Sequence, residues 1–128
     1  MKFPRVKVKR SSAGLGLFAL ETIPAGTPIV EYTGERISEA EKDRRGGKYI
    51  MNMNDEVFID GKDRSNVARY INHACRPNAE AFNYDDERVI IEATKTISTG
   101  SEITIDYGEE YWRDHCQPCR CANCVNSG

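Results

Sequence analysis

The sequence lacks the long apolar segments that membrane-spanning helices and secretory signals require. No run in its 128 residues approaches the roughly 20 apolar residues of a transmembrane helix. The N-terminus carries basic residues, but no apolar stretch follows them, so it does not fit a secretory signal. We therefore expect a soluble protein without a membrane partner, located in the cytoplasm or, in a eukaryotic host, in the nucleus.

The chain also lacks an excess of positive charge. Its formal net charge is −2, whereas binding to nucleic acid phosphates requires a clear basic excess. Acidic residues gather late in the chain, between positions 102 and 114. An acidic surface attracts basic peptides, although ordinary solvated side chains explain the same pattern. The charge balance therefore predicts no direct nucleic acid binding.

No internal repeat, low-complexity tract or linker divides the chain, and its length fits one domain. Short alternating apolar segments, separated by glycine, proline and asparagine, predict a mainly β fold. The expected strands cover residues 6–9, 29–32, 49–53, 57–60, 79–82, 88–93 and 102–107. We expect Gly34 to stop the second of them. One helix is expected from Ser38 to Arg45, because Ser38 is a good N-cap and Gly46-Gly47 follows.

A glycine-rich segment, Gly14-Leu-Gly-Leu-Phe-Ala19, fits the G-x-G-x-x-A pattern of dinucleotide-binding folds. That fold requires a long helix after the glycines, but Pro24, Gly26 and Pro28 interrupt the next stretch. We therefore interpret these glycines as a tight turn or as a place where the backbone approaches a ligand.

The cysteines are concentrated near the C-terminus. Cys119-x-Cys121-x-x-Cys124 offers three thiolates at short spacing, which is typical of a zinc site. Either Cys75 or Cys116 could supply the fourth ligand, and the spacing does not choose between them. A disulfide is the alternative, but cytosolic chains rarely keep disulfides and the number of cysteines is odd. The pattern therefore favours zinc.

Four segments in this order resemble motifs of the SET-domain protein lysine methyltransferases. The most specific is Arg-Tyr-Ile-Asn-His-Ala-Cys-Arg-Pro-Asn, which matches the family's central R-F-I-N-H-S-C-x-P-N motif. The matching segments are Gly14–Ala19, Glu31–Glu35, Arg69–Asn78 and Gly100–Gly108. The cysteine tail is similar to the family's post-SET zinc segment. The resemblance therefore spans almost the whole chain.

The resemblance implies a SET-domain fold of several small sheets with one short helix. In this fold the central motif and the last strand cross in a knot-like arrangement. It also implies a SET catalytic domain at residues 1–112 and a C-terminal zinc-binding tail at residues 113–128. The region between Gly34 and Ser65 is short, so a homodimer could be needed to complete the substrate groove.

S-adenosyl-L-methionine is the cofactor that the resemblance implies, and a lysine ε-amine of a basic protein is the acceptor. The substrate would be a histone tail or a non-histone protein. Family members with a post-SET site take the fourth zinc ligand from the central motif, which implies Cys75 with Cys119, Cys121 and Cys124. The usual tail spacing is C-x-C-x4-C, whereas this chain has C-x-C-x2-C. Cys116 therefore stays open as an alternative.

Residue roles follow from the same comparison. Tyr107 corresponds to the catalytic tyrosine, and Tyr49 to a second channel tyrosine, although a structural role fits Tyr49 nearly as well. His73 would act largely through its backbone, and Arg69 would hold the motif in register through backbone carbonyls. Trp112 could cover the adenine or simply pack. The expected cofactor contacts are Gly14, Leu15, Gly16, Tyr49, Arg69, Asn72, His73, Tyr107 and Trp112.

The implied reaction needs a neutral amine, but a free lysine has a pKa of about 10.4 and is almost entirely charged at neutral pH. An apolar aromatic channel beside a sulfonium disfavours the charged amine, so a dedicated base is not obligatory. Ile105 stands where the family often has Phe or Tyr, which predicts room for more than one methyl group. An inactive SET-like module and a zinc-ribbon nucleic acid binder are the rival hypotheses. The first is disfavoured because Tyr107, Asn72 and His73 are present, and the second because the tail is acidic.

Overall fold

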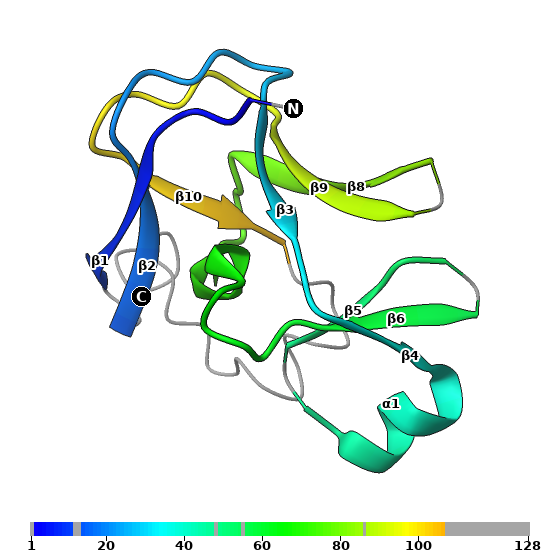
Figure 1. Ribbon diagram of the computed structural model, residues 1–128. Helices are drawn as coiled ribbons and strands as arrows, with labels where there is room; N and C mark the ends of the chain where they lie inside the picture. Colours follow the sequence, from blue (N-terminus) through cyan, green and yellow to red (C-terminus); the bar gives the residue numbers. More distant parts are fainter. Residues whose placement is uncertain (1, 12–13, 48, 55, 86, 107–128) are drawn as a thin grey trace.

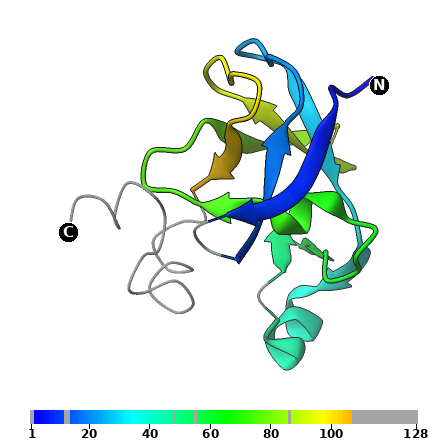
Figure 2. The same cartoon turned by 90° about the vertical axis from the view of Figure 1, so that its left-hand side faces the viewer.

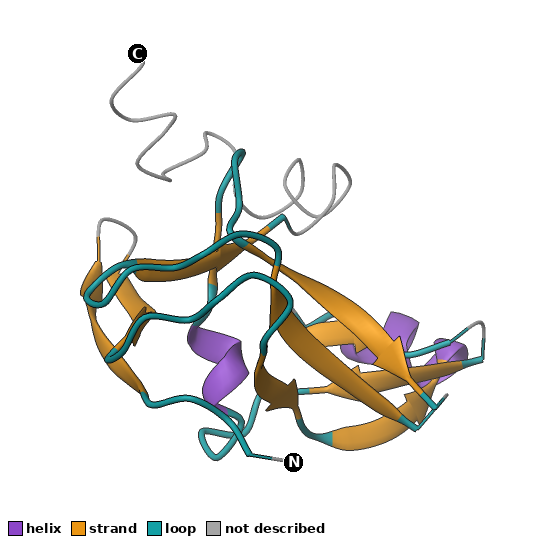
Figure 3. Cartoon of the chain, turned by 90° about the horizontal axis from the view of Figure 1, so that it is seen from above, coloured by secondary structure: helices purple, strands orange, loops and turns teal. Residues whose placement is uncertain are grey.

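The computed structural model describes residues 2–11, 14–47, 49–54, 56–85 and 87–106 (Figure 1). Within them, short strands dominate and helix is confined to two short segments (Figure 3), which confirms the predicted mainly β fold class. No helix in this part of the chain is long and apolar enough to cross a membrane. The strands are β1 Val6–Ser11, β2 Gly14–Ala19, β3 Pro28–Tyr32, β4 Glu35–Ser38, β5 Ile50–Asn52, β6 Val57–Asp60, β7 Asn72–His73, β8 Ala79–Tyr84, β9 Arg88–Ala93 and β10 Glu102–Ile105. The helices are α1 Glu39–Arg45 and the 3₁₀ helix η1 Val67–Tyr70.

The strands form three small sheets with the orders β1-β2-β10-β7, β3-β9-β8 and β4-β6-β5. Seen from the side, β1 and β2 lie together with β10 next to β2 (Figure 2). The last described strand, β10, therefore sits between the start of the chain and its middle. It pairs antiparallel with β2 and parallel with β7, where Thr104 lies opposite Asn72 and Ile105 opposite His73.

The loop after β7 is fastened to β10 by hydrogen bonds as well as by strand pairing. The backbone N–H of Ala74 donates to the Ile105 carbonyl at 3.0 Å. The Asn78 side chain donates to the Glu102 carbonyl at 2.8 Å and accepts from the Thr104 N–H at 2.9 Å. The Asn78 amide thus pairs with β10 as a further strand would. This is the crossing of the central motif and the last strand that the sequence predicts.

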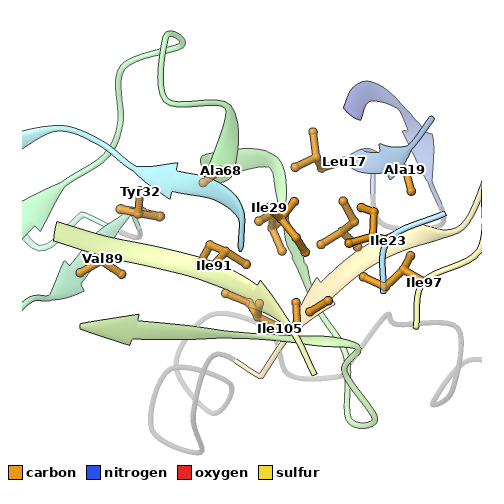
Figure 4. Packing of buried hydrophobic residues seen from close by; sticks show 14 of the residues in the cluster. Leu17, Ala19, Ile23, Ile29, Tyr32, Ala68, Val89, Ile91, Ile97 and Ile105 are labelled. Atoms are coloured by element: carbon orange, nitrogen blue, oxygen red, sulfur yellow. The ribbon is translucent and has the colours of Figure 1, made fainter. Parts of the chain in front are cut away.

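A single hydrophobic core joins the three sheets (Figure 4). Leu17 on β2, Ile29 on β3, Ile91 on β9 and Ile103 on β10 are completely buried, and Ile59 on β6 is nearly so. Burying one such side chain contributes about 1.5–3 kcal/mol relative to leaving it exposed. Because every sheet contributes to this core, the sheets hold one another in position around the site described below.

Helix α1 follows the expected local rules. The Ser38 hydroxyl accepts a hydrogen bond from the Glu41 N–H at 3.1 Å, and Gly46 ends the helix with a φ of 60° in the left-handed region. The helix buries none of its side chains. Arg45 attaches it to the neighbouring sheet through Asp60 at 2.9 Å and Glu35 at 3.1 Å.

Four elements differ from the expectation. Gly14–Ala19 is a strand throughout rather than a turn. The next elements in the described residues are the strands β3 and β4, not the long helix of a dinucleotide-binding fold. The chain continues past Gly34 into β4, which the sequence did not predict. A side chain at Gly34 would collide with the backbone of Asp60 and Gly61, so this glycine, two residues after the predicted strand end at Tyr32, also permits a close approach of two chain segments. Helix η1 and strand β7 were also not predicted.

Candidate active site

A cavity of about 500 Å³ opens where the three sheets meet. Its size lies within the range of small-molecule sites. The lining residues come from β3, β5, η1, β8, β9 and the end of β10, with one side chain from the turn before β5. They include Tyr32, Tyr49, Met51, Phe82, Arg69, Ile105 and Asp106. The wall therefore combines aromatic and aliphatic side chains with the amides of Asn52 and Asn83, one cationic and one anionic side chain.

Tyr49 belongs to this wall, and its backbone is held from two sides. Its carbonyl accepts a hydrogen bond from the Tyr32 hydroxyl at 2.6 Å and another from the Gly61 N–H at 2.8 Å. The Arg69 guanidinium lies over its ring, with 4.4 Å between the guanidinium carbon and the ring centroid. The predicted channel tyrosine is therefore placed in a cavity wall, although its role in a reaction stays a prediction.

The buried side-chain amide of Asn66 joins two chain segments next to the cavity. Asn66 is 1% exposed, its side chain donates to the Gly61 carbonyl at 3.0 Å, and it accepts from the Thr33 N–H at 3.1 Å. A side chain at Gly61 would collide with the Tyr32 ring and with Asn66. Sequence reasoning missed Asn66 and Gly61. No local pattern identifies them, because their partners lie up to 33 residues away.

The glycine-rich strand β2 and the central motif meet at Asn72. The Asn72 side-chain nitrogen lies within hydrogen-bonding distance of three oxygen atoms: the Leu15 carbonyl at 2.8 Å, Glu102 Oε2 at 2.8 Å and Ser11 Oγ at 3.0 Å. A side chain at Gly16 would collide with the Glu102 carboxylate. The structure thus brings together Leu15, Gly16 and Asn72, three of the predicted cofactor contacts. It adds Glu102, which the sequence analysis did not single out.

His73 lies beside this polar group with an 8% exposed side chain. Burial lowers the pKa of its imidazole, and the Asp106 carboxylate, 3.7 Å from Nδ1, partly opposes this effect. The ring is therefore mainly neutral at pH 7. Its Nε2 lies 4.0 Å from the Cys75 sulfur. These contacts give the imidazole a packing role between β7 and the end of β10, as expected for a residue that acts through its backbone.

Arg69 contacts aromatic rings where backbone carbonyls were expected. Its guanidinium carbon lies 4.4 Å from the Tyr49 ring centroid and 5.2 Å from that of Tyr70. A hydrogen bond to Tyr49 raises the pKa of Arg69 above its already high value, so the side chain stays charged. Arg69 therefore belongs to the wall of the cavity, and a direct contact with a cofactor stays a prediction.

Several predicted site residues lie outside the described residues. They are Tyr107, Trp112, Cys116, Cys119, Cys121 and Cys124. Tyr107 follows directly on Asp106, which lines the cavity. Cys75 is described, and its side chain is exposed on the surface after β7. Within the described ranges no three His, Cys, Asp or Glu side chains gather closely enough to hold a metal ion.

The model of the SET domain family matches residues 14–108. Over 116 residues, or 80% of the chain, it is 38% identical to histone-lysine N-methyltransferase set1 of Dictyostelium discoideum. Over 133 aligned residues, covering 94% of the chain, it is 36% identical to histone-lysine N-methyltransferase ASHH1 of Arabidopsis thaliana. It is 40% identical over 126 residues, or 87% of the chain, to histone-lysine N-methyltransferase Set2 of Drosophila melanogaster. These alignments span 8%, 27% and 5% of the respective relatives. The chain belongs to the SET-domain family.

Proposed function

We propose that this chain is an S-adenosyl-L-methionine-dependent protein-lysine N-methyltransferase that acts on a histone or another basic protein. The observation that carries the proposal is the pairing of β7 with β10. This pairing places Asn72 and His73 beside Thr104 and Ile105, and Ile105 and Asp106 line the same cavity as Tyr49. The family match and the names of the relatives support the same activity.

The cofactor would supply an electrophilic methyl group and carries an α-ammonium group. Two acceptors beside Asn72, the Leu15 carbonyl and the Glu102 carboxylate, each receive the Asn72 amide at 2.8 Å and keep a further lone pair for a cationic nitrogen. Glycine at position 16 lets the Glu102 carboxylate lie against the β2 backbone. Leu15, Gly16, Asn72 and Glu102 are therefore the described residues that would hold the methionine end.

The cavity would receive the acceptor lysine. Its aliphatic and aromatic wall, including Met51, Phe82 and Ile105, disfavours a charged amine. The neutral amine is the nucleophile that the transfer needs, and aligning it with the methyl group lowers the barrier by up to roughly 7–11 kcal/mol. Tyr107 would orient this amine with its hydroxyl. Ile105 is smaller than the aromatic residue often found there, so we expect more than one methyl transfer.

A zinc ion would tie the tail to the central motif through Cys75, Cys119, Cys121 and Cys124. The exposed Cys75 thiol can be approached by a tail from outside. Zinc favours four ligands of this type in a tetrahedron. If near-unit zinc remained in the Cys75→Ser variant, the fourth ligand would be Cys116. The division into a catalytic domain at residues 1–112 and a tail at residues 113–128 belongs to this proposal.

Transfer of radiolabel from S-adenosylmethionine tests the proposed function. The purified chain would be mixed with core histones and, separately, with cell lysate, and the labelled residue identified by mass spectrometry. We expect label on lysine side chains of basic proteins. Absence of transfer to any protein, or label on another residue type, would contradict the proposal. Gel filtration of the same sample with and without substrate peptide would show whether a homodimer forms.

A further inference from the structure

We infer that Arg69 is a positioning residue that fixes the Tyr49 ring in the cavity wall and thereby limits how many methyl groups the acceptor lysine receives. The inference rests on the proposed function. It assigns Arg69 a task that neither the cofactor contacts nor the transfer of the methyl group requires.

The environment of Arg69 is unusual for an arginine. Its Nε is shielded from solvent and has no hydrogen-bond partner among the described residues. A guanidinium normally pairs with a carboxylate through two parallel hydrogen bonds. Here the guanidinium lies against the rings of Tyr49 and Tyr70, at 4.4 and 5.2 Å, and makes a hydrogen bond to Tyr49. Both distances lie within the range of about 6 Å over which a cation and an aromatic face attract each other. The planar group is therefore placed to stack on Tyr49.

Arg69 is attached to a well-fixed part of the molecule. Its backbone N–H donates to the Asn66 carbonyl at 3.1 Å, and Asn66 is itself buried and hydrogen-bonded on both sides of its amide. The preceding Ala68 is 3% exposed. The guanidinium consequently projects from a rigid segment toward Tyr49, whose own element is only a turn.

The Tyr49 ring needs such support. Hydrogen bonds from Tyr32 and Gly61 fix the Tyr49 carbonyl, but they do not determine the side-chain torsions. A guanidinium on one face of the ring prevents the ring from swinging to that side. It also occupies that face, so an acceptor amine can meet only the other face or the hydroxyl edge. Because Tyr49 and Ile105 line the same cavity, the angle of this ring sets part of the space around the amine.

Arg69→Lys is the sharpest test, because it keeps the positive charge but removes the planar group that stacks on the ring. Methylated products on a lysine peptide would be counted by mass spectrometry under single-turnover and multiple-turnover conditions. We expect the ratio of higher to lower methylation states to rise at least about fivefold. Calorimetry on the same variant measures the affinity for S-adenosylmethionine, because Arg69 is also a predicted cofactor contact. The matched control is Arg64→Lys, at an exposed loop position, which should change neither quantity.

A Tyr49→Ala background separates positioning from general destabilisation. If Arg69 acts through Tyr49, adding Arg69→Lys to Tyr49→Ala changes the product ratio no further. An unchanged product ratio in Arg69→Lys, or an equal effect of that change with and without Tyr49, would overturn the inference.

Failure of the proposed function has a different signature. If the wild-type chain transfers no methyl group, neither the proposed function nor the limit on methylation holds. NMR spectra of tyrosine-labelled protein would then test the contact between Arg69 and the Tyr49 ring alone. Arg69→Lys should shift the Tyr49 ring resonances, identified with Tyr49→Phe, and speed the flipping of that ring. Unchanged resonances would show that Arg69 does not position Tyr49.

Discussion

The two sides of the site are built in different ways. On the side of β2, β7 and β10, polar groups converge: three oxygens surround the Asn72 nitrogen within 3.0 Å. On the side of the cavity, rings and aliphatic side chains pack beside the amides of Asn52 and Asn83, and the Tyr32 hydroxyl donates to the Tyr49 carbonyl. The first side suits a charged, hydrogen-bonding ligand, and the second suits an alkyl chain that ends in an amine. Changes on one side should therefore leave the other side's ligand largely unaffected.

Asn72→Ala should have the largest effect, because it removes the nitrogen that three oxygens share. Its acceptors are partly exposed, and a hydrogen bond to a charged group such as Glu102 contributes about 1.5–3 kcal/mol, which corresponds to roughly a 10- to 150-fold loss of affinity. We expect the loss for S-adenosylmethionine, measured by calorimetry, to lie near the upper end, since the Leu15 carbonyl and the Glu102 carboxylate are both affected. Asn52→Ala, on the cavity side, is the matched control and should leave this affinity unchanged. An equal loss in both variants would contradict the division of the site.

Tyr32→Phe should act mainly on the cavity side. It removes the 2.6 Å hydrogen bond to the Tyr49 carbonyl and leaves the bond from Gly61 in place. A single hydrogen bond contributes about 0.5–1.5 kcal/mol net, so we expect a loss of about 1 kcal/mol in the free energy of unfolding. KM for a lysine peptide should rise while the affinity for S-adenosylmethionine stays constant. If the cofactor affinity fell instead, the two sides would not be separable.

How far the sequence could predict the two sides of the site depends on how far apart in the sequence the contacting residues lie. The Gly14–Gly16 segment and Asn72 stand in local motifs, so their placement together was expected. Glu102 was missed, since only the register of β10 against β2 and β7 turns its carboxylate toward them. The strand end before Gly34 was predicted, but the close approach of Gly34 to the backbone of Asp60, 26 positions later, was not. No periodic pattern in the sequence predicts that Arg69 lies on the ring of Tyr49.

Ser38→Ala should have a smaller effect that is confined to stability. Loss of an N-cap costs about 1 kcal/mol, and the hydroxyl of Ser38 contacts the Glu41 N–H rather than either side of the site. The melting temperature should fall by a few degrees. Both cofactor affinity and peptide KM should match the wild type. A change in either ligand's binding would show that α1 takes part in the site.

The smallest effect is expected at acidic pH, in the contribution of the Glu41 carboxylate to the free energy of unfolding. Hydrogen bonds from Arg44 and Arg45 lower the pKa of Glu41 to about 2 from an ordinary value of 4.5. The stabilisation from this carboxylate is present above pH 4.5 and is lost as the pH falls toward 2. Because Glu41 lies near the surface, the contribution is small. In Glu41→Gln the free energy of unfolding should depend less on pH between 4.5 and 2 than in the wild type. A pH dependence identical to that of the wild type would contradict these ion pairs in solution.

The central claim is that Tyr107 is the catalytic tyrosine, and Tyr107→Phe tests it most directly. The rate of methyl transfer to a histone peptide and the affinity for S-adenosylmethionine would be measured on the same preparations, with Tyr84→Phe on the distant end of β8 as the control. We predict that Tyr107→Phe lowers the rate about 100-fold or more, as loss of one well-placed hydrogen-bonding group in an active site does, while cofactor affinity changes little. Tyr84→Phe should transfer methyl groups normally. A Tyr107→Phe variant as active as the wild type would contradict the account.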